Sequence, residues 1–201
     1  MSNLLIIGAD NKIARAVREN LQYDPDDHTT LFVRYQSAIN NEIKESDRVI
    51  EGKVTDLHVL KMAMHDQDII YADINRNLAD AANTIIEAMH GEHVKRLIFA
   101  TTSGIYDQLP ETYGEWDKQQ IDAAAADFYQ AAKLIRTSDL DYTLVRPFWL
   151  HRSLKQDENM AMNAEPFKPT DLSQDHVVKV ITDLIQDPDK YQHTSISIDK
   201  D

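Results

Sequence analysis

The sequence predicts an α/β fold of the Rossmann type, a doubly wound and mainly parallel sheet with helices on both faces. Short apolar runs alternate along the chain with longer amphipathic segments, an order typical of strands joined by crossover helices. In the first run, residues 3–8, four consecutive apolar residues follow an asparagine and stop at a glycine, as in a strand that is buried on both faces. There is no internal repeat.

The remaining elements follow from apolar spacing and turn residues. A turn is expected at Asp24–Asp27, a helix end and turn at 183–189, and an edge strand where residues 194–198 alternate as TSISI. Further strands are expected at 29–33, 48–51, 68–72, 94–101 and 142–146, and helices at 13–21, 56–65, 78–89, 117–137 and 175–185.

Length and composition narrow the function classes. The 201 residues suit one domain spanning residues 1–201, and a net charge of −13 argues against a nucleic-acid partner. No apolar stretch reaches the roughly 20 residues that cross a bilayer, so no membrane partner is expected. The chain starts without a basic leader and contains no cysteine, which together favour a cytoplasmic protein. The one histidine cluster, 90–93, has no evident third ligand, so no metal site is predicted.

The loop after the first strand is the first candidate site. A dinucleotide-binding loop carries small residues at three fixed positions before a helix whose amides face a pyrophosphate. Here these positions hold Gly8, Asn11 and Ala14. Asparagine tolerates left-handed backbone angles, and alanine permits close helix packing. The alternative is a strand–turn–helix without a ligand. The residues assigned to the cofactor in this loop are Gly8, Asp10, Asn11, Lys12 and Ile13.

Arg34 indicates which cofactor the loop would hold. It ends the second predicted strand, where a carboxylate would accept from the ribose hydroxyls and an arginine would pair with a 2′-phosphate. NADP(H) is therefore favoured over NAD(H). The alternatives are a solvated Arg34 at a strand end and, for Lys12, an ordinary exposed position in the first helical turn.

Several motifs together resemble those of the atypical short-chain dehydrogenase/reductases. More narrowly, the chain is similar to the small NmrA-like and biliverdin-reductase-B-like NAD(P)-binding proteins. The resemblance runs from Leu4 to about Ile198. It rests on GADNKIARAV, on LFVR, on GKVTD at 52–56, on RLIFATTSGIY at 96–106, and most specifically on SDLDYTLVRP at 138–147.

The resemblance implies further cofactor contacts. Residues 53–55 would lie near the adenine, although the family usually has an aspartate where this chain has Lys53. The residues after the fourth strand would line a ribose, and those after the fifth would line the nicotinamide. The implied contacts are Lys53, Val54, Ala72, Asp73, Ala100 and Thr101, with Pro147 and Phe148 closing over the nicotinamide.

The catalytic pair of such reductases, Tyr-x-x-x-Lys, occurs literally at Tyr129 and Lys133. Counted back from Ser138, however, the family's Tyr and Lys positions fall on Ala124 and Phe128. The literal pair lies five residues later, which turns it about 140° around the helix. We therefore expect an exposed helix face there, with a catalytic role as the alternative.

The hydroxyl residues after the fifth predicted strand match the family's catalytic positions better than Tyr129 and Lys133 do. Thr102 takes the position of the catalytic serine of related proteins, with Ser103 beside it. Either could hold a substrate oxygen, or both could simply satisfy backbone groups at a strand end.

Two functions remain open. The first is an NADPH-dependent oxidoreductase acting on a small carbonyl, quinone or flavin; the substrate itself is not identified. The second is a non-catalytic module in which NADP(H) occupancy changes the surface offered to a protein partner. The polar segment 151–170, with two prolines, is expected to be a lid or substrate loop.

Overall fold

The structure, a computed structural model, describes residues 3–21, 29–40, 43–44, 46–101, 115–147 and 174–198. The predicted turn at Asp24–Asp27 lies outside these residues. Within these described ranges, thirteen elements follow one another as strands and helices in alternation, apart from one short 3₁₀ turn. The observed element bounds differ from the predicted ones by a few residues at most, and 29–33 and 194–198 match at both ends.

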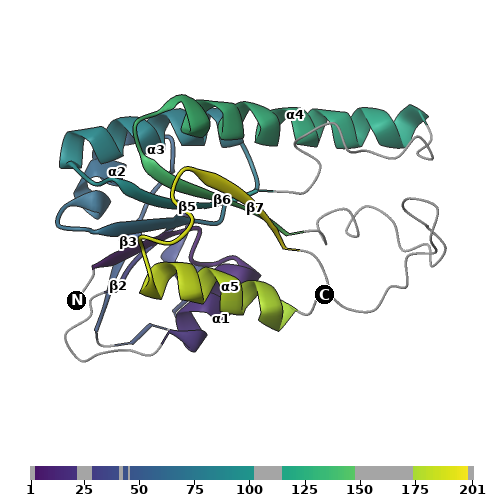
Figure 1. Cartoon of the computed structure of the whole chain (residues 1–201). Coiled ribbons are helices and arrows are strands. Elements are labelled where there is room, and N and C mark those ends of the chain that lie inside the picture. The colour runs from purple at the N-terminus through teal and green to yellow at the C-terminus, as the bar shows by residue number, and fades with distance from the viewer. Residues whose placement is uncertain are drawn as a thin grey trace.

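Seven strands form a single sheet in which every neighbouring pair is parallel. The order across the sheet is β3-β2-β1-β4-β5-β6-β7, and Figure 1 shows β7 at one edge of it. The strands are β1 (Leu4–Ile7), β2 (Thr29–Val33), β3 (Asp47–Glu51), β4 (Ile69–Ala72), β5 (Arg96–Ala100), β6 (Asp141–Pro147) and β7 (Thr194–Ile198). The predicted doubly wound fold is thus confirmed.

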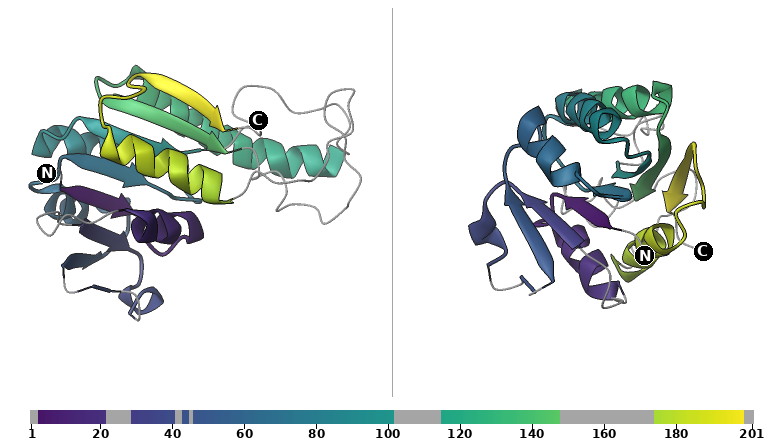
Figure 2. Two further views of the ribbon diagram at one scale, coloured as in Figure 1. Left: turned by 60° about the horizontal axis from the view of Figure 1, so that its bottom comes forward. Right: turned by 90° about the vertical axis from the view of Figure 1, so that its left-hand side faces the viewer.

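The helices cover both faces of the sheet. Helices α1 and α5 pack together on one face, whereas α2, α3 and α4 cover the other, as the end-on view in Figure 2 shows. None of the helices in the described part of the chain is long and apolar enough to span a membrane. The helices are α1 (Lys12–Asn20), α2 (Leu57–Met64), α3 (Leu78–Glu92), α4 (Glu115–Thr137) and α5 (Gln174–Gln186), with the 3₁₀ turn η1 at Gln36–Ala38.

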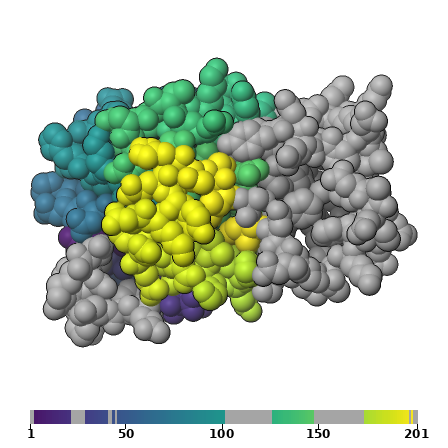
Figure 3. All heavy atoms as spheres, viewed as in Figure 1, coloured from purple at the N-terminus to yellow at the C-terminus, as the bar shows by residue number. Residues whose placement is uncertain are grey.

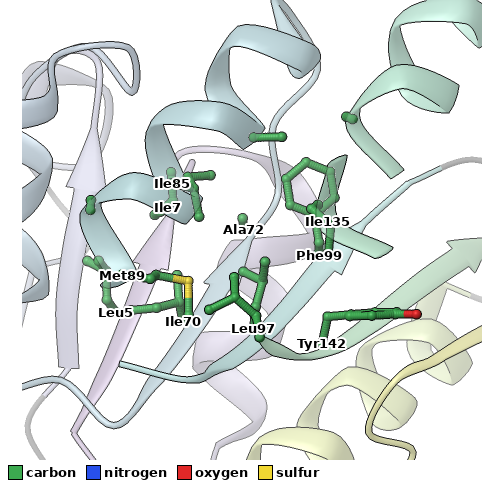
Figure 4. Close-up of a cluster of buried hydrophobic side chains, with 14 of the residues drawn as sticks. Leu5, Ile7, Ile70, Ala72, Ile85, Met89, Leu97, Phe99, Ile135 and Tyr142 are labelled. Atoms are coloured by element: carbon green, nitrogen blue, oxygen red, sulfur yellow. The ribbon is translucent and has the colours of Figure 1, made fainter. Parts of the chain in front are cut away.

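The two strands at the switch point, β1 and β4, are buried at every position, because helices cover both faces of the sheet there. Successive side chains alternate between two cores, so Leu5 and Ile7 face α3 while Leu4 and Ile6 face α1 and α5. Figure 4 shows the first core, where strand side chains meet Ile85 of α3. Such continuous burial explains why period-two alternation is absent from the central strands.

Helix α3 begins with a cap supplied by another helix. Its first residue is preceded by Asn77, which has a positive φ of 51° and makes no side-chain cap. Instead Asp127 of α4 accepts hydrogen bonds from the amides of Leu78 (2.8 Å) and Ala79 (3.0 Å). The carboxylate satisfies two of the unpaired amides at this helix start. It therefore ties α4 to the start of α3.

The far edge of the sheet is held by a buried arginine. The Arg96 guanidinium, on the first residue of β5, donates to the Asp141 carbonyl (2.9 Å), the Thr143 hydroxyl (2.8 Å) and the Lys190 carbonyl (3.1 Å). These bonds join β5 and β6 to the turn that leads into β7. Figure 3 shows that turn and β7 in yellow, on the face of the molecule between α4 and α5.

The order of strands reverses between β1 and β4, since β2 lies on one side of β1 and β4 on the other. The ladder continues one residue beyond the strands, because the Asp73 amide donates to the Ile7 carbonyl (2.9 Å). Ligands of open parallel sheets bind beyond the strand carboxyl ends at such a switch point. The residues following Ile7 and Ala72 are therefore the place to look for a site.

The shared cap makes a prediction about stability. Replacing Asp127 by alanine should lower the free energy of unfolding by about 1–2 kcal/mol, because two helix-start amides lose their acceptor. Asp127→Asn keeps one acceptor oxygen, so its free energy of unfolding should lie between those of Asp127→Ala and wild type. Urea denaturation measures all three. The exposed neighbour Gln130→Ala on the same helix is the control and should change little. Equal stability of Asp127→Ala and wild type would contradict the role of the cap.

Candidate functional site

The turn between β1 and α1 depends on a glycine. Gly8 has a φ of +79°, and a Cβ added to it would lie 2.0 Å from the Asp73 carbonyl oxygen. The amides of Gly8 (3.0 Å) and Ala9 (3.3 Å) both donate to the Phe32 carbonyl. Only a residue without a side chain fits such a close approach of two backbones. The turn therefore brings the start of α1 directly over the ends of β1 and β4.

Asn11 adopts a different conformation from the one expected. Its backbone is extended, with φ −73° and ψ 147°, and it occupies the N-cap position of α1. The prediction that it would take left-handed angles is wrong, because Gly8 alone absorbs the chain reversal. The side-chain amide of Asn11 instead donates to the Asp73 carbonyl oxygen. Asparagine here fastens the turn to β4, which a glycine could not do.

Asp73 places a carboxylate at the start of α1. Its Oδ2 accepts a hydrogen bond from the Ala14 amide (3.2 Å), and Ala14 itself is buried, as small-residue packing predicts. Burial raises the pKa of the half-buried Asp73 carboxyl to about 6. The Ala14 hydrogen bond opposes this rise and the nearby Asp10 carboxylate adds to it. One of the amides that could hold an external anion is thus already paired with an internal one.

Arg15 joins the glycine turn to the loop after β2. Its Nε donates to the Asp10 carbonyl (2.9 Å) and its Nη2 to the Ala38 carbonyl (2.9 Å). The same loop is held from β3, because the Glu51 carboxylate accepts from the Gln36 amide (2.6 Å). The sequence analysis missed both residues. Nothing in their spacing shows that these side chains reach across to a neighbouring loop.

Two predicted cationic contacts lie at the ends of adjacent strands. Arg34 directly follows β2 and is exposed, and Lys53 lies just past β3 and is exposed as well. The Gly52 amide donates to the Val33 carbonyl (2.9 Å), which keeps the two strand ends side by side. Val54, next to Lys53, is half-buried against the core. The structure therefore brings Arg34 and Lys53 to the same edge of the sheet as the glycine turn.

The other side of the switch point is described only in part. Ala100 is half-buried, and the amide (2.7 Å) and hydroxyl (3.1 Å) of Thr101 both donate to the Val145 carbonyl. That hydroxyl therefore serves the β5–β6 pairing. Pro147 ends β6 and is buried. The remaining predicted positions on this side, Thr102, Ser103, Phe148 and the segment 151–170, lie outside the described residues.

The literal Tyr-x-x-x-Lys pair lies on the outer surface of α4. Tyr129 is 46% exposed, and Lys133 is exposed as well. Phe128, at the position where the family's lysine was expected, is buried in the core that lies beneath α2, α3 and α4. This agrees with the predicted exposed helix face. Among the described residues, no group of three or more His, Asp or Glu side chains is arranged to hold a metal ion.

The residues present fit a nicotinamide dinucleotide in three respects. The Gly8 turn brings the start of α1 against the backbone that follows β4, the first amides of α1 have no partner within the helix, and Arg34 offers a cation at the end of the neighbouring strand. The negative charges of Asp73 and of the nearby Asp10 oppose an anion there.

The raised pKa of Asp73 has a consequence for stability. Because the folded state binds this proton more tightly than the unfolded state does, the stabilisation is complete below about pH 4 and is lost as pH rises to about 6. Asp73→Asn, whose amide oxygen still accepts from Ala14, should therefore be more stable than wild type by about 1–2 kcal/mol at pH 8. At pH 4 the two should differ little.

Urea denaturation at the two pH values measures this difference. The control is Asp66→Asn, which removes one exposed carboxylate at a residue with a positive φ of 59°, at the opposite end of β4. A stability gain for Asp73→Asn that is the same at pH 4 and pH 8 would contradict the assignment.

Solved structures share this fold along the whole chain. A Rossmann-fold NAD(P)-binding family protein from Shigella flexneri is 35% identical, with a TM-score of 0.76, over 100% of this chain and 94% of that one. A short-chain dehydrogenase/reductase from Veillonella parvula in complex with NADP is 23% identical, with a TM-score of 0.75, over 99% and 94%. ChuY, an anaerobilin reductase from Escherichia coli O157:H7, is 19% identical, with a TM-score of 0.73, over 98% and 96%.

The two less similar structures show the fold alone, and a search of curated proteins finds no match. The sequence itself matches the NAD(P)H-binding family over residues 8–188. That range begins at the glycine whose turn brings α1 over the strand ends and includes every described residue of the candidate site. The chain is thus a member of the NAD(P)H-binding family of Rossmann-fold proteins.

Proposed function

We propose that this protein is an NADPH-dependent oxidoreductase that reduces a small carbonyl, quinone or flavin acceptor. The observation that carries the proposal is the placement of an exposed Arg34 beside the Gly8 turn, at the switch point of a sheet of the NAD(P)H-binding family. A neighbour of the same fold was solved with NADP, which supports the choice of cofactor. The absence of cysteine supports a cytoplasmic location.

The described residues divide the work of holding the cofactor. The free amides in the first turn of α1 would bind the pyrophosphate, since they have no partner within the helix. Arg34 would pair with the 2′-phosphate through two parallel hydrogen bonds, and Lys53 would add a second cation near the adenine. Arg15 and Glu51 position the loop that follows Arg34. When bound, the cofactor supplies the hydride.

Proton transfer would proceed without the Tyr129–Lys133 pair. Its exposure on the outer side of α4 supports a reaction in which solvent or the Thr102 hydroxyl delivers the proton. Thr102 and Ser103 would hold the substrate oxygen, Pro147 and Phe148 would close over the nicotinamide, and the segment 151–170 would form the lid. All of these parts would belong to one domain, residues 1–201.

A second function is favoured by one observation, the buried Phe128 at the position where a catalytic lysine was expected. On this alternative the protein binds NADP(H) without turnover, and cofactor occupancy changes the surface that a protein partner recognises. It predicts binding in the absence of NADPH oxidation across a panel of quinones, flavins and small carbonyls. It also predicts that partner capture differs between the oxidised and reduced cofactor.

Arg34→Glu tests the cofactor preference. Wild type should bind NADPH more tightly than NADH, and the variant should lose about 10–100-fold in NADPH affinity, because a charge-assisted pair is replaced by repulsion. NADH affinity should change by less than about threefold, since NADH lacks the 2′-phosphate. Arg136→Glu, an equal charge change in the last turn of α4, is the control. Isothermal titration calorimetry measures all six affinities, and equal wild-type affinity for the two cofactors would overturn the assignment.

Tyr129→Phe and Lys133→Ala test the register of the catalytic helix. Because both side chains are exposed on the outer face of α4, each variant should keep NADPH oxidation within about twofold of wild type. The measurement uses whichever acceptor the panel identifies, and Gln130→Ala serves as the matched surface control. Loss of turnover in both variants, with NADPH binding retained, would show that the literal pair is catalytic after all.

A further inference from the structure

Asp73 occupies an unusual position for a carboxylate. It follows β4 at the switch point, and its Oδ2 accepts a hydrogen bond from the Ala14 amide, in the first turn of α1. Its main chain is pinned as well, because its amide donates to the Ile7 carbonyl (2.9 Å) and its carbonyl accepts from the Asn11 side chain. The carboxylate therefore cannot leave the start of α1 without a side-chain rotation in a half-buried space.

The start of α1 attracts an anion whether it belongs to the protein or to a bound ligand. The first amides of α1 have no partner within the helix, and the helix dipole adds partial positive charge there. A dinucleotide pyrophosphate is recognised by this same group of amides. An external pyrophosphate and the Asp73 carboxylate would then share one small positive region, and two like charges held this close disfavour each other.

We propose that Asp73 is a positioning residue that makes dinucleotide affinity depend on pH, because its ionised carboxylate competes with the pyrophosphate for the start of α1 and its protonated form does not. This inference rests on the proposed cofactor site. A protonated Asp73 keeps its acceptor oxygen for Ala14 and gains an O–H that could donate to a phosphate oxygen. Binding should therefore be accompanied by proton uptake near neutral pH.

The groups around Asp73 determine the sign of this effect. Asp10, in the glycine turn, contributes negative charge, and Tyr71, on the same face of β4, is fully buried and neutral at physiological pH. From α1, Lys12 is exposed, and the Arg15 side chain turns to the Asp10 and Ala38 carbonyls. From the loop after β4, Arg76 is exposed. Burial raises the pKa of Asp73 to about 6, which brings its titration close to the physiological range.

The test compares Asp73→Asn with wild type, using NADPH as the probe between pH 5.5 and pH 8. The ratio of the two dissociation constants cancels the titration of the cofactor's own 2′-phosphate, whose pKa is also about 6, and that of the histidines. At pH 5.5 the ratio should be close to one. At pH 8 the variant should bind about tenfold more tightly or better, since wild type must take up a proton or accept the repulsion.

Calorimetry in two buffers of different ionisation enthalpy supplies a second readout. Wild type should take up a fraction of a proton from the buffer at pH 7.5 on binding NADPH, and Asp73→Asn should take up less by that fraction. Asp66→Asn, the same charge change at the opposite end of β4, should keep the wild-type pH dependence. This control separates a local effect from the overall negative charge of −13.

Each outcome is informative. No NADPH binding by wild type or by Asp73→Asn at any pH would overturn the proposed function. Binding with a dissociation-constant ratio that stays the same across the pH range would overturn the competition alone and leave the cofactor site in place. Weaker binding by Asp73→Asn at pH 8 would also overturn it, because the carboxylate would then be a contact of the cofactor, as a ribose-binding role requires.

Discussion

The contact on which the rest of the site depends is the approach of the β1–α1 turn to the backbone after β4. Gly8 lies so close to the Asp73 carbonyl that a Cβ would be 2.0 Å from its oxygen. Because the two backbones touch, Asn11 reaches the same carbonyl with its side chain, and the Asp73 carboxylate reaches the Ala14 amide. Because Gly8 has no Cβ, the start of α1 can lie close to the end of β4, with the Asp73 carboxylate between them.

This arrangement balances two requirements. A site for a dinucleotide needs unpaired amides at the start of α1, yet unpaired amides are costly in a half-buried position. The Asp73 carboxylate accepts a hydrogen bond from one of these amides and so reduces that cost. Its own burial is unfavourable, and the pKa of its carboxyl group rises to about 6. Asp127 serves α3 in the same way from a neighbouring helix, but no cofactor group is expected there. In both cases a side chain from an element distant in the sequence pairs with the first amides of a helix.

Several residues of the candidate site could be predicted from the sequence. The glycine at position 8, the small residue at 14 and the arginine after the second strand are all local signals, since each depends on one element and its immediate turn. The contacts that Asn11 and Asp73 make in the structure could not be predicted from the sequence. Asn11 was expected to supply left-handed angles, but Gly8 supplies the whole reversal, and the Asn11 side chain instead tethers the turn to the residue after β4. Both roles depend on a contact between elements far apart in the chain.

The sequence by itself determined the order and type of the elements, because short apolar runs bounded by turn residues alternate with longer segments of helical spacing. The resemblance also predicts that the literal Tyr129–Lys133 pair is out of register with the family's catalytic positions. Only the tertiary structure decided which side chains meet at the switch point. Arg15, Glu51 and Asp73 act on backbone groups of other elements. Such contacts arise from the packing of the sheet and helices, and no local spacing encodes them.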